Sequence, residues 1–198
     1  MKYYLLRSDM FNPCKWTLGD VHNVDNWLFS DPTPYFMEPG KYTIDVFQDG
    51  EELDYSESAA FGVPVLSIKA KNALTGLPEV DEPYHHVVLE PVKVENKQVD
   101  QDYFVMIVET QIDCVDEERS EFQKYEENDP VRPDKAGQYR AFFNLVIDPS
   151  KTGDHHIFRL KKHLGSIIVS EEVKRRFEGS GVTGAVFESV NGDQKTIA

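Results

Sequence analysis

The residues of this chain that could carry out chemistry are a glycine-rich motif, two groups of histidines and two cysteines. Gly179-Ser180-Gly181-Val182-Thr183-Gly184 has the G-x-G-x-x-G spacing of a dinucleotide-binding loop. In such a loop the motif follows a strand and opens a helix, so that phosphate meets the helix N-terminus. Here it follows a helical pattern and precedes an apolar run, which is the reverse order. The motif therefore predicts the end of a helix and a turn, with no bound cofactor.

The histidines are concentrated at His85-His86 and at Asp154-His155-His156. Neighbouring residues of a strand point to opposite faces of a sheet, so each pair would offer at most one metal ligand on a given face. The remaining histidines show no ligand spacing. We therefore expect ordinary surface or half-buried histidines and no metal site.

A nucleophile is equally hard to assign. The sequence contains no G-x-S-x-G elbow and no phosphate-binding glycine loop with a lysine. Cys14 and Cys114 are the only cysteines, and no local pattern pairs either of them with a histidine. No catalytic residue is predicted, and we expect a protein that is not an enzyme. An enzyme of unidentified type stays an alternative, because a missing motif does not exclude a reaction.

Charge is the most uneven property of the sequence. The 198 residues include 35 acids and 21 bases, for a net charge of -14. Nucleic acid is not an expected partner, because phosphate contacts need clustered lysine and arginine. A partner protein with a basic surface is more natural, since complementary fields speed encounter. The alternative is that the acidity only aids solubility.

Half of this charge lies in one segment. Between Glu109 and Asp129, nine acids oppose Arg119 and Lys124, which leaves a net charge of -7. The segment has few apolar residues, so we expect it on the surface, as a helix with a solvated face or as a mobile loop. Its aromatic residues would anchor a partner beside the acids. The candidate partner-binding residues are Asp113, Asp116, Glu117, Glu118, Glu121, Phe122, Tyr125, Glu126, Glu127 and Asp129.

The best-defined structural elements lie between His156 and Val190. Residues 156–160 alternate apolar with polar, which predicts a half-buried strand, and a β-branched run follows at residues 167–169. Ser170 stands where a helix N-cap belongs, and Glu171 and Glu172 suit the positive end of a helix dipole. The pattern predicts a helix that begins near Glu171 and ends by Gly181, then a strand over residues 185–190.

This part of the chain resembles a bacterial immunity-protein family of polymorphic toxin systems. The family's typical tail has an "iF-rl" strand, an "ivSe-lk" helix that ends in a phenylalanine, and a "G-tG" turn into a strand. The likeness is strong over the C-terminal half and loose over the N-terminal half. It implies a protein that binds a cognate toxin and blocks it. The matching residues are Phe158, Arg159, Val169, Ser170, Glu171, Val173, Lys174, Phe177, Gly181, Gly184, Phe187 and Val190.

The other elements follow from the same patterns. We expect strands at residues 3–6, 42–47, 83–94, 103–115 and 138–148, with Phe142, Phe143, Leu145 and Ile147 as core candidates. Residues 16–36, from Trp16 to Phe36, read as a loop pinned to the core by aromatics, and this segment is the second candidate for partner binding.

An internal repeat is a further hypothesis. Residues 61–76 echo residues 164–179, with Ser67 over Ser170 and a short helix after each serine. In this alignment Lys71 meets Lys174, Leu74 meets Phe177 and Gly76 meets Gly179. The alternative is convergent capping chemistry in two unrelated segments.

Together these patterns predict an α+β fold with a mixed, mainly antiparallel sheet and a few short helices. Two lobes, residues 1–98 and 99–198, are one arrangement, and a single continuous domain is the other. The sequence shows neither a signal peptide nor a run of ~20 apolar residues, so we expect a cytoplasmic protein with no membrane partner. A non-catalytic adaptor or structural protein remains the other alternative, and the oligomeric state stays open.

Overall fold

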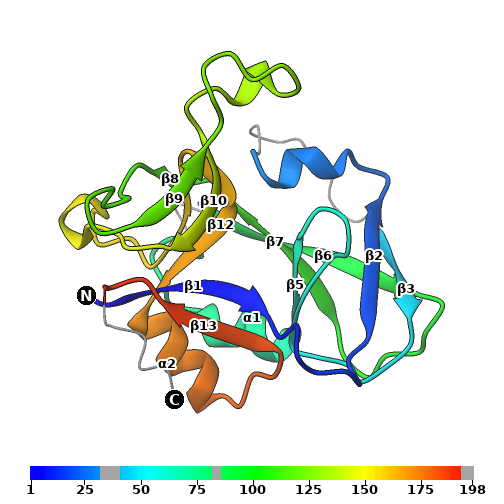
Figure 1. Ribbon diagram of the computed structural model, residues 1–198. Coiled ribbons are helices and arrows are strands. Elements are labelled where there is room, and N and C mark those ends of the chain that lie inside the picture. Colours follow the sequence, from blue (N-terminus) through cyan, green and yellow to red (C-terminus); the bar gives the residue numbers. More distant parts are fainter. Residues whose placement is uncertain (32–40, 82–85, 193–198) are drawn as a thin grey trace.

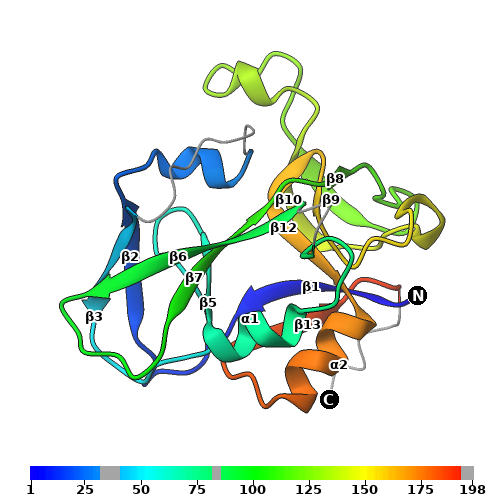
Figure 2. The ribbon, with the colours of Figure 1, turned by 180° about the vertical axis from the view of Figure 1, so that it is seen from behind.

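The computed structural model describes residues 1–31, 41–81 and 86–192. Within these ranges the fold is mainly β, with two α-helices and mixed sheets, so the α+β class is confirmed. Figures 1 and 2 show two twisted sheets side by side, with both α-helices beneath the place where the sheets meet. A separate hairpin rises from the top of Figure 1.

The first sheet has the strand order β13-β1-β12-β11-β8, and the second has the order β2-β3-β6-β7-β5-β4. The pairs β3–β6 and β8–β11 are parallel, and the other pairs between named strands in the described ranges are antiparallel. The strands are β1 (Tyr3–Ser8), β2 (Thr17–His22), β3 (Thr43–Gln48), β4 (Tyr55–Glu57), β5 (Pro64–Ser67), β6 (Val87–Glu95), β7 (Tyr103–Val108), β8 (Gln111–Ile112), β9 (Glu121–Lys124), β10 (Tyr139–Asn144), β11 (Ile157–Leu160), β12 (His163–Ser170) and β13 (Ala185–Ser189). The helices are α1 (Ile68–Leu74) and α2 (Glu171–Gly179), with 3-10 turns η1 (Asn26–Phe29), η2 (Pro133–Lys135) and η3 (Pro149–Lys151).

Most predicted strands are present, but three expectations are wrong. The segment from Trp16 to Phe36 holds a strand, β2, and the turn η1, with residues 32–36 outside the described ranges. Phe143 is 64% exposed, because it lies on the outer face of β10. The strand predicted over residues 103–115 ends at Val108.

That break moves the chain from one sheet to the other. β7 is buried along its whole length between β5 and β6. The Glu109 N–H still donates to the His86 carbonyl of the second sheet (2.9 Å), whereas the Thr110 carbonyl accepts from Arg159 N–H of the first (2.8 Å). β8 then pairs with β11. One extended segment therefore serves two sheets, which a period-2 pattern cannot reveal.

Each α-helix begins at a serine that ends a buried strand. The Ser67 hydroxyl accepts from the Ala70 N–H (3.2 Å), and the Ser170 hydroxyl accepts from the Val173 N–H (3.4 Å). Both serines are fully buried. A side-chain oxygen here satisfies a backbone donor that the first helical turn leaves unpaired. The predicted helix after Ser170 is thus confirmed.

The two segments of the hypothesised internal repeat have matching structural surroundings, and the match extends to the neighbouring strands. The first unit is β4–β5–α1–β6–β7, arranged as β6-β7-β5-β4. The second is β11–β12–α2–β13, arranged as β13-β1-β12-β11, so β1 takes the place of β7. Ser67 of β5 pairs with Tyr103 of β7, and Ser170 of β12 pairs with Tyr3 of β1. The two units therefore share strand order, register and helix cap.

Side chains repeat as well. Lys71 lies over the Phe104 ring of β7 (3.9 Å), and Lys174 lies over the Tyr4 ring of β1 (4.6 Å). Leu74 and Phe177 are buried at matching places on the two helices. Matching Gly76 with Gly179 is wrong, because α2 is longer. Gly181 stands two residues past the end of α2, as Gly76 does past α1, and both have positive φ (63° and 86°).

The two helices pack together and share one core. Ala70 and Leu74 of α1 lie in the same buried cluster as Val173 and Phe177 of α2, together with β-strand residues from both sheets. Two further clusters fill the second sheet and the base of the hairpin. The boundary predicted at residue 98 falls between β6 and β7, which are hydrogen-bonded neighbours, so it does not separate the two sheets.

Arg159 corrects the prediction of a half-buried strand at residues 156–160. All four residues of β11 are buried, and Arg159 is only 3% exposed. Its guanidinium donates to the carbonyls of Leu164 (2.5 Å) and Phe29 (2.9 Å). Desolvation by this burial lowers the pKa of Arg159 to about 10. The side chain thus ties η1 to the first sheet. Because arginine is polar, the sequence pattern wrongly predicted that this position is exposed.

Gly184 lies where two segments approach most closely. Its φ is +85°, and a Cβ there would collide with the Tyr55 carbonyl oxygen and lie 2.8 Å from the Leu53 Cβ. Only glycine tolerates both conditions. The G-x-G-x-x-G spacing thus serves a turn between α2 and β13, as predicted.

We expect Gly184→Ala to lower the free energy of unfolding by at least ~2 kcal/mol, because the new methyl group must displace backbone. Chemical denaturation monitored by circular dichroism measures the change. Gly165→Ala is the matched control, since Gly165 in β12 is exposed and a Cβ there meets nothing within 4 Å. Equal effects of the two substitutions would contradict the assignment.

Candidate functional site

The acidic segment is not the predicted helix or mobile loop, because it leads from β8 into β9, the first strand of a hairpin with β10. Cys114 and Val115 are buried at its start, and Val115 bridges to Ile147. The Ser120 hydroxyl donates to the Val146 carbonyl (3.0 Å) and accepts from the Val146 N–H (2.9 Å). β9 then pairs with β10. The expectation failed because the apolar partners of this segment lie some twenty residues later in the chain.

Aromatic rings hold the hairpin against the first sheet. The Phe122 ring packs edge-on against Tyr139 (5.1 Å) and Phe142 (6.3 Å), and Phe142 contacts His163 of β12. Phe122 is half-buried in this cluster. The Phe122 ring therefore packs within the protein and does not present the exposed aromatic side chain that was predicted to anchor a partner. Tyr125 lies near the cations of Lys135 (5.9 Å) and Arg140 (5.8 Å), farther along the hairpin.

Part of the negative charge is neutralised locally. Asp113 pairs with Lys162 (2.8 Å), Asp116 with Arg119 (2.6 Å) and Glu117 with Lys124 (2.7 Å). Glu117 also accepts from the Tyr139 hydroxyl (2.6 Å). Arg119 holds the pKa of Asp116 below its ordinary value, and Lys124, then Tyr139, do the same for the pKa of Glu117. The Asp129 carboxylate accepts from the backbone N–H groups of Arg132 and Val131, which lower its pKa.

The remaining carboxylates of the segment face solvent. Glu118, Glu121, Glu126 and Glu127 are exposed, and none of them forms an ion pair with another residue of the described ranges. Beside them lies an open hollow of about 490 Å³. It is lined by Asp113, Asp116, Glu117, Glu118, Asp148 and Lys151. Four of the predicted acids, Asp113, Asp116, Glu117 and Glu118, thus line one hollow, while Phe122 packs against a core cluster.

The second candidate for partner binding, the aromatic segment 16–36, contains both buried and exposed rings. Trp16 and Phe29 are 1% exposed and belong to the core of the second sheet, as the packing interpretation predicted. Trp27 is 62% exposed and packs edge-on against Phe61 (5.1 Å). Tyr35 and Phe36 lie outside the described residues.

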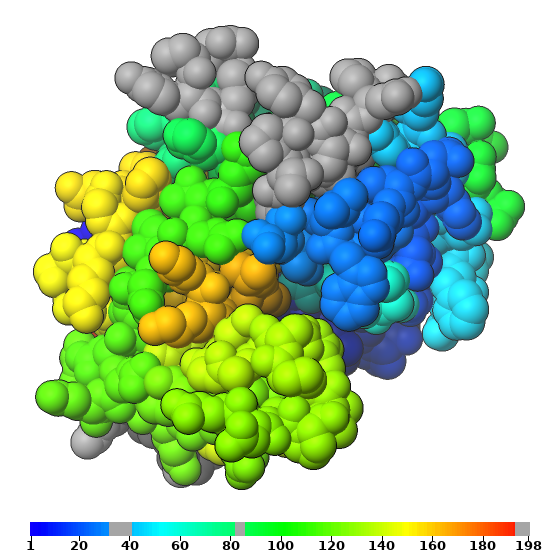
Figure 3. All heavy atoms as spheres, turned by 90° about the horizontal axis from the view of Figure 1, so that it is seen from above, coloured from blue at the N-terminus to red at the C-terminus, as the bar shows by residue number. Residues whose placement is uncertain are grey.

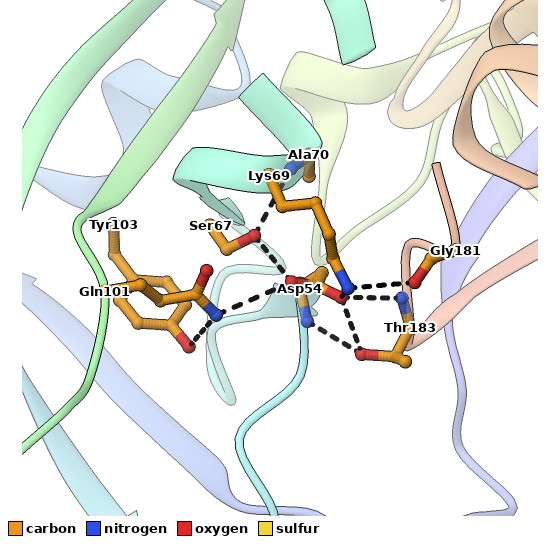
Figure 4. Close-up of polar contacts among 8 residues, drawn as sticks. All are labelled: Asp54, Ser67, Lys69, Ala70, Gln101, Tyr103, Gly181 and Thr183. Atoms are coloured by element: carbon orange, nitrogen blue, oxygen red, sulfur yellow. Dashed lines mark hydrogen bonds and ion pairs between the residues drawn. The ribbon is translucent and has the colours of Figure 1, made fainter. Parts of the chain in front are cut away.

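A buried polar network that the sequence did not predict joins the two repeated units (Figure 4). The Asp54 carboxylate accepts from Lys69 Nζ (2.6 Å), from the Thr183 N–H (2.9 Å) and hydroxyl (3.0 Å), and from the Ser67 hydroxyl (2.7 Å). Lys69 also donates to the Gly181 carbonyl (2.9 Å). Asp54 thus ties the cap of α1 to the turn after α2.

The network's charges are matched within the chain. Burial would raise the pKa of Asp54, but Lys69, Thr183 and Ser67 outweigh it and hold the pKa below its ordinary value. With at least four donors on one carboxylate, little capacity is left for a substrate. Thr183 lies 129 residues from Asp54, so no local pattern could have identified the pair.

The histidines and cysteines offer no evident reactive centre. His86, His155 and His156 line one pocket with Glu79, while His85 lies outside the described residues. Across residues 1–31, 41–81 and 86–192, no group of three or more histidine, cysteine or acidic side chains is placed to hold a metal ion. Cys114 is buried, and desolvation raises its pKa to about 12, so its thiol stays protonated.

These features define a mainly β protein with an acidic hairpin on its surface. A model of the immunity protein family (Imm11) matches residues 3–192, and the chain therefore belongs to this immunity protein family. The match covers nearly the whole chain, so the likeness is not confined to the C-terminal half. A search of curated proteins found no match. In the part of the chain that the structure describes, neither helix is long and apolar enough to cross a membrane.

We expect Asp54→Asn to destabilise the protein by ~2 kcal/mol at pH 7, because charge-assisted hydrogen bonds are lost. The depressed pKa makes this contribution complete above the unfolded pKa of ~3.9 and lost as pH falls through the folded pKa. The stability gap between wild type and variant should therefore shrink on acidification. Urea denaturation across pH measures it, with Asp102→Asn, at an exposed site, as control. A gap that is independent of pH would refute the role of Asp54.

Proposed function

We propose that this immunity protein neutralises a cognate toxin by binding it and blocking its active surface, without turnover and without a cofactor. The proposal rests on family membership and on one structural observation. That observation is a set of four exposed glutamates on the hairpin and directly before it, Glu118, Glu121, Glu126 and Glu127, none of which forms an ion pair with another described residue. We expect the toxin to present a basic surface and the encounter to take place in the cytoplasm.

Electrostatic steering is the first role that we assign to the hairpin. The loop that joins β9 and β10 projects away from both sheets in Figure 1, and its Glu126 and Glu127 are exposed. Charges at the outer edge of a protein act mainly on the association rate. Glu118 and the hollow beside it would receive basic side chains of the toxin.

Steric occlusion is the second role. Val131 in the projecting loop is 79% exposed, and it supplies an apolar contact among the charges. The aromatic cluster around Phe122 would act indirectly, because it fixes the hairpin on the sheet and so limits the entropy lost on docking.

Co-expression tests the function itself. A toxin-like open reading frame beside the gene for this chain should arrest growth when expressed alone, and co-expression of this chain should restore growth. The readout is colony formation with both proteins confirmed as soluble. Persistent arrest under those conditions would overturn the proposal.

Association kinetics test the surface. We expect the triple reversal of Glu118, Glu121 and Glu126 to Lys to slow association by at least about tenfold at low salt, and less as ionic strength rises. Stopped-flow mixing with the purified toxin at two salt concentrations measures the rate. Glu117 is left unchanged in this variant, because it accepts hydrogen bonds from Lys124 and Tyr139.

The matched control reverses three exposed acids beside the second sheet, Glu51, Asp100 and Asp102. It changes the net charge by the same amount, so it isolates position from overall charge. Equal slowing by both triple variants would show that the hairpin is not the docking site.

A further inference from the structure

The two repeated units meet at two comparable junctions. At one, the Thr183 carbonyl in the turn after α2 accepts from the Tyr55 N–H, at the start of β4 (3.0 Å). At the other, the Glu79 carboxylate in the loop after α1 accepts from the His156 N–H, directly before β11 (2.5 Å). In each case the loop that follows one helix reaches the first residues of an outer strand in the other unit.

The two junctions differ in whether a lysine or arginine forms an ion pair with the buried carboxylate. At the first, Lys69 in α1 neutralises Asp54. The equivalent position in α2, two residues after the cap serine, is Glu172, and it pairs with Arg175 and Arg176 (both 2.7 Å). Within the described residues, no lysine or arginine forms an ion pair with Glu79. The second junction therefore has the acid without the internal cation.

Glu79 is buried and incompletely bonded. The residue is 4% exposed, and its Oε2 atom has no hydrogen-bond partner within the described residues. The His155 Nδ1 lies 3.6 Å from the other oxygen, Oε1. A buried carboxylate oxygen without a donor is costly, because it has lost water and gained nothing in return.

A pocket opens onto this carboxylate. It measures about 320 Å³ and is lined by Glu79, His86, Asp154, His155 and His156. This volume accommodates one long side chain. The segment that lines it, residues 153–156, directly follows Asp148 and Lys151, which line the acidic hollow. In Figure 3 the yellow segment, near residue 150, and the projecting hairpin loop (yellow-green) are visible on the same face of the molecule.

We propose that this pocket receives a lysine or arginine side chain of the toxin, whose cationic group pairs with the Glu79 carboxylate as Lys69 pairs with Asp54. The inference rests on the proposed function and adds a second contact, deeper than the exposed glutamates. Because this pair would be desolvated, its loss acts on dissociation, whereas loss of the rim charges acts on association.

Dissociation kinetics provide the first test. We expect Glu79→Gln, which keeps the shape and the acceptor for the His156 N–H, to speed dissociation of the purified toxin at least about tenfold. Asp154→Asn is the control, since it removes the same charge from an exposed position on the rim of the same pocket, and it should change the rate less than about threefold. Equal dissociation rates for Glu79→Gln and wild type would overturn the inference and leave the proposed function intact. No binding by wild type would instead remove the proposed function.

A probe that needs no toxin provides the second test. Titration of the free protein with n-butylguanidinium should shift the His155 and His156 ring resonances in NMR spectra, and Glu79→Gln should abolish the shift. The absence of a saturable shift up to roughly 100 mM would overturn the inference. A parallel titration with Zn²⁺ distinguishes the other cation class. Tight, Glu79-dependent Zn²⁺ binding without a guanidinium response would make this a metal site and overturn the proposal.

Discussion

The fold depends on two buried serines at which a strand becomes a helix. Ser67 and Ser170 have no exposed surface, so each hydroxyl must find both a donor and an acceptor inside the protein. Each serves the first turn of its helix and bonds one further side chain, Asp54 at Ser67 (2.7 Å) and His156 at Ser170 (2.8 Å). Those two residues also offer the backbone carbonyls that accept from the N–H groups of Ser67 and Ser170. The caps thereby fix where each helix starts and how the neighbouring outer strand lies.

This arrangement couples the repeated units instead of leaving them as independent lobes. Asp54 belongs to the first unit but is held by Thr183 of the second, and His156 of the second is held by Glu79 of the first. The shared core between α1 and α2 lies between these contacts. A change at one junction is therefore transmitted to the cap of a helix, and from there to the core.

The sequence predicted what depends on near neighbours. The cap at Ser170, the strand over residues 3–6 and the turn at Gly181 each follow from a few adjacent residues, and all are present. Arg159 was misjudged because the acceptors that make its burial tolerable, at Phe29 and Leu164, are set by the tertiary fold. The hairpin was not predicted for the same reason. Phe122 packs against Tyr139 and Phe142 of β10, which lie about twenty residues later in the chain. For the candidate site, the run of acids could be read from the sequence, because charge is a local property, whereas the Asp54 and Glu79 junctions depend on contacts between distant segments.

The place of β1 has a consequence for biosynthesis. Its residues are the first of the named strands to leave the ribosome, yet they pair with β12 and β13, which are made last. Leu5 and Leu6, both buried in the finished protein, must wait unpaired while more than 150 residues are added. The first unit, by contrast, contains all its strands in one stretch and has what it needs to form early. Closure of the first sheet around β1 requires contacts of very long sequence separation, which are slow to form. The step that completes the fold is thus the insertion of its oldest strand, and until then an apolar strand stays open to chaperones and to misassembly.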